Sequence, residues 1–403
     1  MNSSLGSDGA SYKILLGAFA LVPFIAFVAP RFLAYWPAIV GLLSMLYFVG
    51  YQKKCPKIDF SLICFIMAPV LLGGGSLLWA QSFDVSAERV QKMGLLLFGG
   101  GLFFASIQFY RPPSVSVCVK LFSPLVSLMC VLVVFELSFN FPFYRLTHEI
   151  TDVYGRVMPA VYNRGSIVLL FVGMIIFCLA VRSNMYLYAV LNFLSLLLLC
   201  LYSDSQSLQL AFVVGALALL VFPYRSAFGW GLAWLFIAVL TLSALHLSMW
   251  MFSHAVNVSS NAFMAAVSAG PRLEIWDYVS RYAMDSPWFG YGIEVTRSIE
   301  DFDSNEVFQG GTSILHPHNF AVQFWIEFGL FGVGLLLCYF ALLFRRLATN
   351  CTNSLLGRAC FPTFIMFLTI SSIGYGVWQS WWLGLILLVS AFVHYVSRPS
   401  VRL

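Results

Sequence analysis

Charged side chains are scarce in this sequence: they make up 10% of its 403 residues, whereas 60% are hydrophobic. An ordinary soluble domain carries about 25% charged residues. So few charges cannot cover a globular surface with hydrated groups, which excludes a soluble protein and makes the bilayer the solvent. The basic residues form no run and no basic helix, so nothing in the sequence indicates nucleic-acid binding.

Several chemical signatures are also missing. The sequence contains no P-loop, no dinucleotide-binding motif and no nucleophile elbow. None of the nine cysteines lies in the two long polar connections, 138–159 and 247–317, so no disulfide framework is needed there. No third ligand has the spacing of a zinc site. Asp301 and Asp303 could together hold a divalent metal, but a solvated acidic loop explains them better.

Apolar windows dominate what is present. A helix needs about 20 residues to cross a bilayer, and about twelve windows approach that length. They are 12–29, 32–51, 58–79, 90–109, 115–137, 160–180, 184–202, 206–222, 226–246, 318–344, 359–376 and 378–396. A lipid-exposed strand would leave its backbone unsatisfied, so each window is predicted to be a helix. The fold class is therefore an all-α polytopic membrane protein with about twelve transmembrane helices.

The windows divide the chain into three parts. Residues 1–246 are predicted to form the first nine transmembrane helices, residues 247–317 a large outer loop with amphipathic helices, and residues 318–403 the last three helices. Although Lys13 and the first window imitate a secretory signal, further windows follow at once, so we interpret this window as an uncleaved helix. Gly374, Gly376 and Trp378 are expected to mark a turn or a kink between the last two windows.

Basic residues indicate the orientation. With the N-terminus inside, the inner loops and the C-terminal tail hold most of them: Lys53, Lys54, Lys57, Arg111, Arg182, Arg225, Arg345, Arg346, Arg358, Arg398 and Arg402. The short outer loops hold few, and positive residues stay on the cytoplasmic side. We therefore expect both termini inside and both long connections outside.

The longer outer connection contains an amphipathic pattern. An apolar stripe recurs at three- and four-residue steps, formed by Leu273, Trp276, Val279 and Ala283. This stripe predicts a helix along the membrane interface, which Pro287 is expected to end.

Four arginines are predicted to lie at the outer surface. Arg272 begins the amphipathic helix, where a cation opposes the helix dipole but joins the helix N-terminus in a pair suited to phosphate. Arg281, further along the same helix, is equally well explained as solvated. Arg164 and Arg156, near the sixth window, either face an anionic lipid headgroup or snorkel to the interface.

His316, His318 and Asn319 stand where the outer connection meets the tenth window. A lone interfacial histidine is more often a hydrogen-bonded structural residue than a catalyst, so these residues alone leave both roles open. Glu327 lies deeper in the same window, where it either pairs with a neighbouring helix or supports the histidines.

A histidine beside several arginines suits one type of reaction at a membrane boundary. Histidine accepts a proton near neutral pH, and arginine binds phosphate through a planar fork. Together they favour displacement at a carbon whose leaving group is a phosphate or a pyrophosphate, because the base deprotonates an attacking hydroxyl and the arginines offset the departing charge. A lipid-linked sugar diphosphate has such a bond, and its displacement needs no metal and no other cofactor.

Two motifs resemble the O-antigen ligase family, which shares a core with the O-antigen polymerases. One is a histidine, an asparagine, nine residues, a glycine, two residues and a second glycine, here His318, Asn319, Gly329 and Gly332. The other is an arginine-led helix followed by a proline–aromatic–glycine turn, here Arg272, Leu273, Trp276 and residues 287–292. The Asn163–Arg164 pair resembles the entry of an earlier span in the family.

The resemblance implies a membrane glycosyltransferase with a GT-C-like bundle and a large periplasmic loop. It implies inverting transfer of polysaccharide (O-antigen) from an undecaprenyl-pyrophosphate carrier to a hydroxyl of lipid A–core oligosaccharide. The reaction would take place at the periplasmic face of a bacterial inner membrane, without ATP or metal. Donor glycan, lipid A–core acceptor and membrane lipid are thus the expected partners.

The family's site residues map onto particular positions of this chain. His318 matches the catalytic histidine and Arg272 the loop arginine. Arg272, Arg164 and Arg156 are expected to bind the donor pyrophosphate, and Asn319, Gly329 and Gly332 to support the motif. Many members also carry an arginine at the outer start of the span that here contains Gln206 and Gln209, so Arg156 or Arg164 is expected to replace it.

Other functions are compatible with parts of the pattern. An O-antigen polymerase uses the same donor but extends a second lipid-linked chain, and a protein O-oligosaccharyltransferase differs in its acceptor. A small-anion transporter is the alternative outside enzymes, and it predicts charges at the bilayer midplane and paired broken helices. The ionisable groups here gather at one face instead, which favours the ligase.

Overall fold

The computed structural model of the protein describes residues 5–57, 59–150, 157–258, 270–299, 302, 314–350 and 355–398. Over these residues it is helical and contains no strand. The first half of the chain forms α1 (Leu5–Val28), η1 (Pro30–Ala34), α2 (Trp36–Met45), η2 (Leu46–Tyr51), α3 (Phe60–Ser76), α4 (Phe83–Ile107), α5 (Val115–Ser138), α6 (Pro142–Thr147), η3 (Pro159–Tyr162), α7 (Asn163–Arg182) and α8 (Tyr186–Tyr202). The second half forms α9 (Gln206–Val221), α10 (Ala227–Leu242), α11 (Ala244–Val258), α13 (Gly270–Met284), η4 (Val295–Ser298), α14 (Phe320–Asn350), α15 (Leu355–Ile373) and α16 (Ser380–Ser397).

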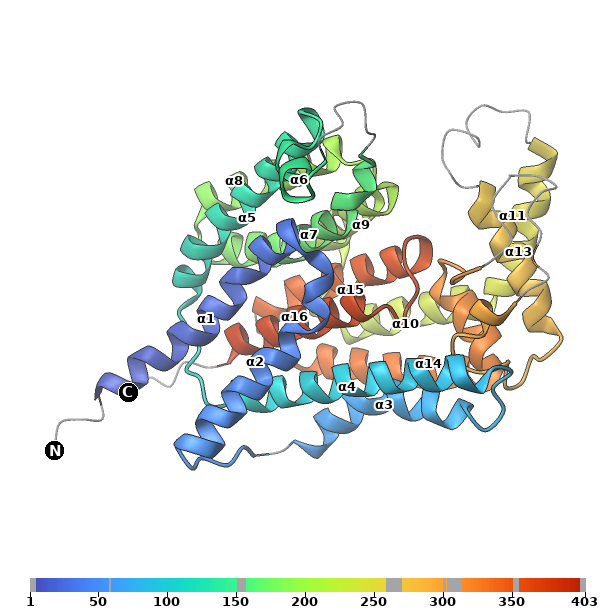
Figure 1. Cartoon of the computed structure of the whole chain (residues 1–403), viewed down its shortest axis with the longest axis horizontal. Coiled ribbons are helices and arrows are strands. Elements are labelled where there is room, and N and C mark those ends of the chain that lie inside the picture. Colours follow the sequence, from blue (N-terminus) through green and yellow to red (C-terminus); the bar gives the residue numbers. More distant parts are fainter. Residues whose placement is uncertain are drawn as a thin grey trace.

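The long helices run along the molecule and leave α11 and α13 at one end (Figure 1). The described start of α1 and the end of α16 lie toward the opposite end in the same view. The side of the membrane that each end faces stays a prediction.

Every predicted window coincides with an apolar helix, but the count of twelve spans is not confirmed. Among the described residues, five helices are long and apolar enough to cross a membrane: Phe83–Ile107, Val115–Ser138, Pro159–Arg182, Phe320–Thr349 and Ser380–Ser397. The other windows form apolar helices of 10–17 residues or the bent pair described below. At 1.5 Å per residue, 17 residues reach only about 25 Å, short of a hydrocarbon core of about 30 Å.

The predicted straight span over 226–246 is instead broken. α10 and α11 meet at Ser243 and bend by 63°, and counting the pair as one span gives up to six candidates. α11 then packs against α13. The chain therefore enters the outer connection as a helix, and the division at residues 246 and 317 stays a prediction.

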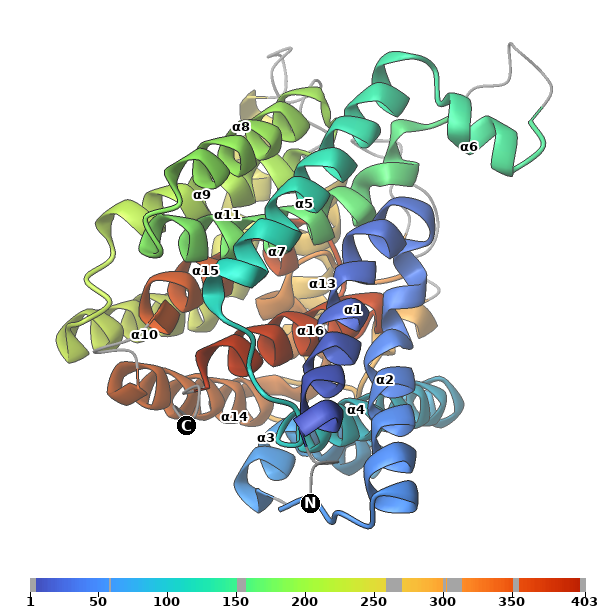
Figure 2. The ribbon, with the colours of Figure 1, turned by 90° about the vertical axis from the view of Figure 1, so that its left-hand side faces the viewer.

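α7 is the central helix of the bundle. Of its most apolar window, 78% is buried inside the protein, more than in any other candidate span among the described residues. It packs against α1, α5, α8 and α15, which surround it in Figure 2. Gly165 permits the contact with α1, because a Cβ there would lie 2.2 Å from the carbonyl oxygen of Ala26. This crossing fixes the start of α7, where Arg164 lies.

The amphipathic helix lies where the stripe predicts it. α13 ends at Met284, shortly before Pro287, and the four stripe residues Leu273, Trp276, Val279 and Ala283 are all buried. They face α11 and α14. The apolar side of this helix therefore packs on the bundle.

Glu136 does not behave as its position near the end of the fifth window suggests. Snorkelling would place its carboxylate in solvent, but only 1% of the residue is exposed. The carboxylate accepts hydrogen bonds from the backbone N–H groups of Phe143 (2.7 Å) and Tyr144 (2.9 Å) and from the Tyr162 hydroxyl (2.8 Å). It thereby binds the start of α6 and the entry to α7 to the end of α5.

Candidate functional site

His318 lies at the mouth of α14 with a fixed ring. Asn319 caps the helix, since its side-chain oxygen accepts hydrogen bonds from the N–H groups of Ala321 (3.0 Å) and Val322 (3.3 Å). The Nδ1 atom of His318 is 2.7 Å from the carbonyl oxygen of Gly374. A carbonyl only accepts, so Nδ1 carries the proton and Nε2 is left as the proton acceptor.

The His316 ring lies against the His318 ring in a tilted contact. The two imidazole centroids are 4.1 Å apart, and the Gln379 side-chain amide lies 3.3 Å from Nε2 of His316. Gly376 permits the close approach, because a Cβ there would lie 2.9 Å from Cγ of His316. Burial, with the His318 ring and nearby arginines adding to it, lowers the pKa of His316 to about 3. This histidine therefore stays neutral at ordinary pH.

The charge of Arg272 acts on His318. Burial lowers the pKa of His318, the charge of Arg272 lowers it further, and the Gly374 hydrogen bond opposes both effects. Burial also lowers the pKa of Arg272. In the described part of the chain no acceptor forms a hydrogen bond with this guanidinium. Arg281 on the same helix differs, because it pairs with Asp277 at 2.9 Å and its side chain is 64% exposed, which supports the solvated interpretation.

Tyr375 connects the two arginines that the sequence singles out. The Arg164 guanidinium carbon is 6.0 Å from the ring centroid of Tyr375 and 6.0 Å from that of Trp381. Burial raises the pKa of the Tyr375 phenol, and the charges of Arg164 and Arg272 lower it, so both cations lie near this ring. The Nε atom of Arg164 is buried and has no hydrogen-bond partner among the described residues.

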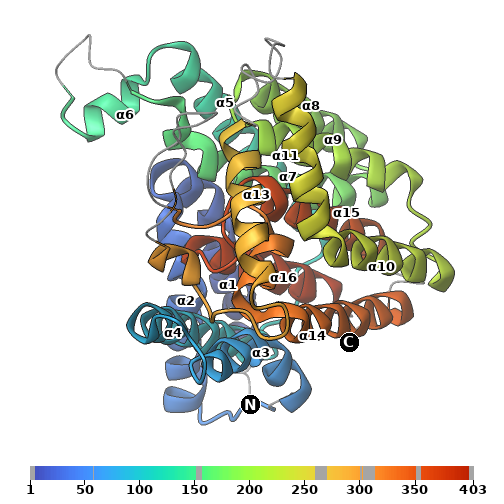
Figure 3. The same ribbon diagram turned by 90° about the vertical axis from the view of Figure 1, so that its right-hand side faces the viewer.

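Of the four residues predicted for catalysis and pyrophosphate binding, the structure thus brings three into one region: His318, Arg272 and Arg164. We call these three, with His316 and Tyr375, the histidine–arginine cluster. Figure 3 looks onto this end of the molecule, where α11 and α13 stand side by side in front of the bundle. Arg156 lies outside the described residues, as do Asp301 and Asp303.

The two motif glycines belong to a break in α14. Gly329 has φ +59° and ψ −158° inside the helix, so the helical hydrogen bonds around it cannot form. The turn over residues 287–292 replaces them. Leu330 and Phe331 donate to the carbonyls of Pro287 (2.8 Å) and Trp288 (3.0 Å), while Tyr291 and Gly292 donate to the carbonyls of Ile326 (2.9 Å) and Glu327 (2.8 Å).

Small residues are required on both sides of this junction. A Cβ at Gly329 would lie 2.5 Å from the carbonyl carbon of Trp288, and one at Gly290 would lie 2.5 Å from the carbonyl oxygen of Ile326. Gly332 follows one turn later, where a Cβ would overlap the Phe328 side chain. The glycines therefore dock the turn that follows α13 onto α14, the helix that His318 precedes.

At the start of α9, where many family members carry an arginine, this chain has Gln206 and Gln209. Neither glutamine supplies a positive charge in place of that arginine. The Gln209 amide donates to the carbonyls of Cys200 (3.1 Å) and Ser203 (2.9 Å), so its donors are used locally. Ser205 caps this helix, because its hydroxyl accepts from the N–H of Leu208. On the neighbouring α7, the Arg164 guanidinium lies 6.0 Å from the Tyr375 ring centroid.

The sequence-based prediction missed Tyr375 and Gln379. Both lie in the turn between α15 and α16, residues 374–379, which the glycines marked only as a turn or a kink. The sequence showed only that both residues lie near two glycines at a predicted outer helix end. They match no motif that would have marked them as site residues.

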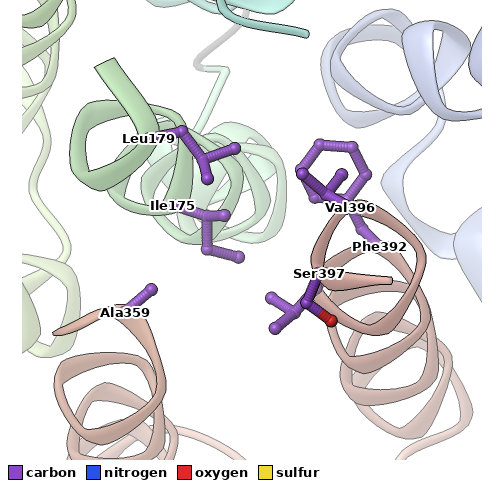
Figure 4. A pocket seen from close by; sticks show the side chains of 7 residues that line it. Ile175, Leu179, Ala359, Phe392, Val396 and Ser397 are labelled. Atoms are coloured by element: carbon purple, nitrogen blue, oxygen red, sulfur yellow. The ribbon is translucent and has the colours of Figure 1, made fainter. Parts of the chain in front are cut away.

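Polar groups distinguish this site from the apolar pocket shown in Figure 4. That pocket lies between α7, α15 and α16 and is lined by Ile175, Leu179, Ala359, Phe392, Val393, Val396 and Ser397. One hydroxyl supplies its only polar side chain. Elsewhere, no group of three or more histidine, cysteine or acidic side chains in the described residues has an arrangement that could hold a metal ion.

Comparison with known proteins agrees with the motifs. Residues 190–337 match the O-antigen ligase family. Among proteins named as candidate polysaccharide ligases, one from Rickettsia typhi is 32% identical over 133 residues, which is 32% of each chain. One from Rickettsia conorii is 29% identical over 138 residues, or 33% of each chain. One from Rickettsia bellii is 23% identical over 255 residues, covering 61% of this chain and 62% of that protein.

The matched part of the chain spans about a third of the length of the Rickettsia typhi and Rickettsia conorii proteins. No solved structure matches the chain. The family match contains Arg272, His318, Gly329 and Gly332, whereas Arg164 and Tyr375 lie outside it. Over residues 190–337, and by these relatives, the chain is similar to the O-antigen ligase family.

Proposed function

We propose that the protein is a membrane glycosyltransferase of the ligase type. It transfers a polysaccharide (O-antigen) from an undecaprenyl-pyrophosphate carrier to a hydroxyl of lipid A–core oligosaccharide, at the periplasmic face of a bacterial inner membrane. The observation that carries this proposal is the hydrogen bond from Nδ1 of His318 to the Gly374 carbonyl, which leaves Nε2 as the proton acceptor on a ring whose pKa the charge of Arg272 lowers. The family match and the polysaccharide ligase relatives support the type of reaction.

The proposed step is a single displacement. Nε2 of His318 takes the proton of the acceptor hydroxyl, whose oxygen forms the new bond to the anomeric carbon. The bond from that carbon to the pyrophosphate oxygen breaks, and the electron pair leaves with the carrier pyrophosphate. Arg272 and Arg164 offset the developing negative charge, and attack from the opposite face inverts the anomeric centre.

The two arginines suit this role because their charges are not neutralised by carboxylates. Neither guanidinium forms an ion pair within the described residues, in contrast to Arg281 and Arg297. A half-buried cation without an anionic partner costs free energy, and a bound pyrophosphate offsets that cost. Arg156 remains a proposed third contact, since it lies outside the described residues.

The decisive experiment is transfer with purified protein in liposomes that contain a polyprenyl-pyrophosphate-linked glycan. His318→Ala is expected to reduce the rate about 10²- to 10⁴-fold, the usual contribution of a general base. The exposed His246 supplies the control, and His246→Ala should keep the wild-type rate. Unchanged turnover in His318→Ala would remove the proposed base.

Three acceptor arms separate the related functions. Product on lipid A–core supports the ligase, lengthening of a second carrier-linked glycan supports the polymerase, and product on protein supports an O-oligosaccharyltransferase. A chelator should leave the rate unchanged. A strict metal requirement would contradict the proposed metal-independent step and direct attention to Asp301 and Asp303.

A further inference from the structure

Glu327 lies deep in α14 and does not contact the histidines. None of its surface is exposed. Its Oε1 atom accepts hydrogen bonds from the backbone N–H of Glu294 (3.1 Å) and the side-chain amide of Gln323 (2.9 Å). Its Oε2 atom accepts from Nε1 of Trp378 (2.5 Å). A carboxyl group in such a position requires its donors, because an unpaired polar group in the interior is costly.

Trp378 belongs to the 374–379 loop and forms hydrogen bonds with both its side chain and its backbone. While its indole N–H donates to Glu327, its carbonyl oxygen accepts from Nη1 of Arg89 on α4 (3.0 Å). Arg89 in turn pairs with Glu294, at 3.0 Å between Nε and Oε1. The neighbouring Val377 donates its N–H to the side-chain oxygen of Gln323 (3.1 Å).

Aromatic contacts also attach Trp378 to α14. Trp378 is 2% exposed, and its ring centroid lies 5.5 Å from that of Phe324 and 6.1 Å from that of Phe328. The middle of the loop is therefore fixed to α14 and α4 by side-chain and backbone hydrogen bonds and by ring contacts. The loop cannot move as a unit without breaking these bonds.

The other residues of the loop face the histidine–arginine cluster. The Gly374 carbonyl binds His318, Tyr375 lies near Arg164 and Arg272, and Gln379 contacts His316. A displacement of Trp378 would therefore be transmitted to the imidazole and to the phenol together.

We infer that Glu327 and Trp378 are positioning residues, whose hydrogen bond holds the 374–379 loop so that Gly374 orients His318 and the Tyr375 ring stays near Arg164. The inference rests on the proposed function, since it assigns these residues a part in glycan transfer. Neither residue touches the reacting atoms. They act through the loop.

Two variants break the bond and a third provides the control. Trp378→Phe keeps an aromatic ring against Phe324 but removes the indole donor. Glu327→Gln cannot accept at both former oxygen positions, because one of them becomes an NH₂ group that faces a donor. Trp234→Phe makes the same chemical change on α10, where the Trp234 indole donates to the Leu337 carbonyl of α14 (3.0 Å) and not to Glu327.

The first readout is glycan transfer by the full-length protein in liposomes. Both loop variants are expected to lose about 10- to 100-fold in kcat, the cost of a catalytic group displaced by about 1 Å. The KM for the carrier-linked donor should change far less, because Arg272 and Arg164 reside on α13 and α7. Trp234→Phe should remain near the wild type in both constants.

The second readout needs no turnover, so it separates failure of this inference from failure of the proposed function. Diethyl pyrocarbonate modifies neutral imidazole, and mass spectrometry of the His318 peptide gives the rate at fixed pH. Releasing the loop frees Nδ1 and opens the site, so His318 should react severalfold faster in both loop variants than in Trp234→Phe. A protein without transferase activity would still show this difference if the loop is held as inferred.

Equal modification rates in all three variants, or loop variants whose kcat matches that of Trp234→Phe, would overturn the inference. Should neither loop variant fold, Arg89→Lys provides the same two measurements. It retains a charge for Glu294 and removes the guanidinium bond to the Trp378 carbonyl, at a position whose side chain is 15% exposed.

Discussion

His318 combines an unusual backbone with a fixed side chain. Its φ of +55° is in the left-handed region, which costs a non-glycine residue about 1–3 kcal/mol unless the surroundings stabilise it. The Asn319 cap follows it directly, and the Pro317 carbonyl before it accepts from the indole of Trp276 (2.6 Å). The geometry therefore aims the ring toward Gly374 and Arg272 instead of along the helix.

The pH dependence of transfer follows from the same residue. Burial and Arg272 lower the pKa of His318, so the imidazole is neutral, and able to accept a proton, at and above its ordinary pKa of about 6.5. The rate is expected to be constant from about pH 6.5 upward and to fall only as the pH drops through the lowered pKa. A profile of kcat/KM against pH checks this, and an acid limb centred above pH 7 would contradict it.

At the scale of elements, the break in α14 is the main structural device. A continuous helix would form its own hydrogen bonds and would have no free groups for the turn at residues 287–292. The break at Gly329 exposes two carbonyls and two N–H groups, and the turn satisfies all four. Since α13 precedes this turn, the junction fixes Arg272 relative to the start of α14, where His318 lies.

Gly329→Ala is therefore expected to destabilise the protein strongly. A side chain at φ +59° costs about 1–3 kcal/mol, and its Cβ would also overlap the Trp288 backbone. Thermal unfolding of the detergent-solubilised protein measures the effect.

Gly334→Ala is the matched control on the same helix, because a Cβ there has no neighbour within 4 Å. Its helix propensity should leave stability equal or slightly higher, by up to about 1 kcal/mol. Equal melting temperatures for the two variants would show that the break does not hold the turn.

At the scale of the whole molecule, orientation decides whether the cluster meets a carrier in the outer leaflet. We expect Cys55, exposed in the Lys53–Lys57 loop, to face the cytoplasm. The exposed Asp204 between α8 and α9 should face the periplasm.

Labelling with a membrane-impermeant maleimide tests this orientation. In variants that keep a single cysteine, the Asp204→Cys protein should react in intact cells with a permeabilised outer membrane. The protein that keeps Cys55 should react only after lysis. Labelling of Cys55 from outside would invert the topology and place the cluster on the wrong side for the proposed donor.

Much of the architecture was accessible without the structure. Helix positions follow from apolar windows, because each helix satisfies its backbone locally. The burial of α13 followed from spacing alone, whereas the choice of His318, Arg272 and Arg164 as site residues rested on the family resemblance. The number of full spans did not follow, since several helices are shorter than the windows and α10–α11 is bent by 63°.

The amino-acid sequence by itself determined that this chain is apolar and helical, and that its basic residues gather in alternate loops. Composition and periodicity decide these properties because they depend on residues close together along the chain. Only the tertiary structure decided what surrounds the imidazole. The Gly374 carbonyl is a backbone group without a sequence signature, and it lies 56 positions after His318. Tyr375, Trp378 and the buried Glu327 gain their roles only where α4, α14 and the 374–379 loop meet, since hydrogen bonds between distant segments depend on packing that local patterns do not specify.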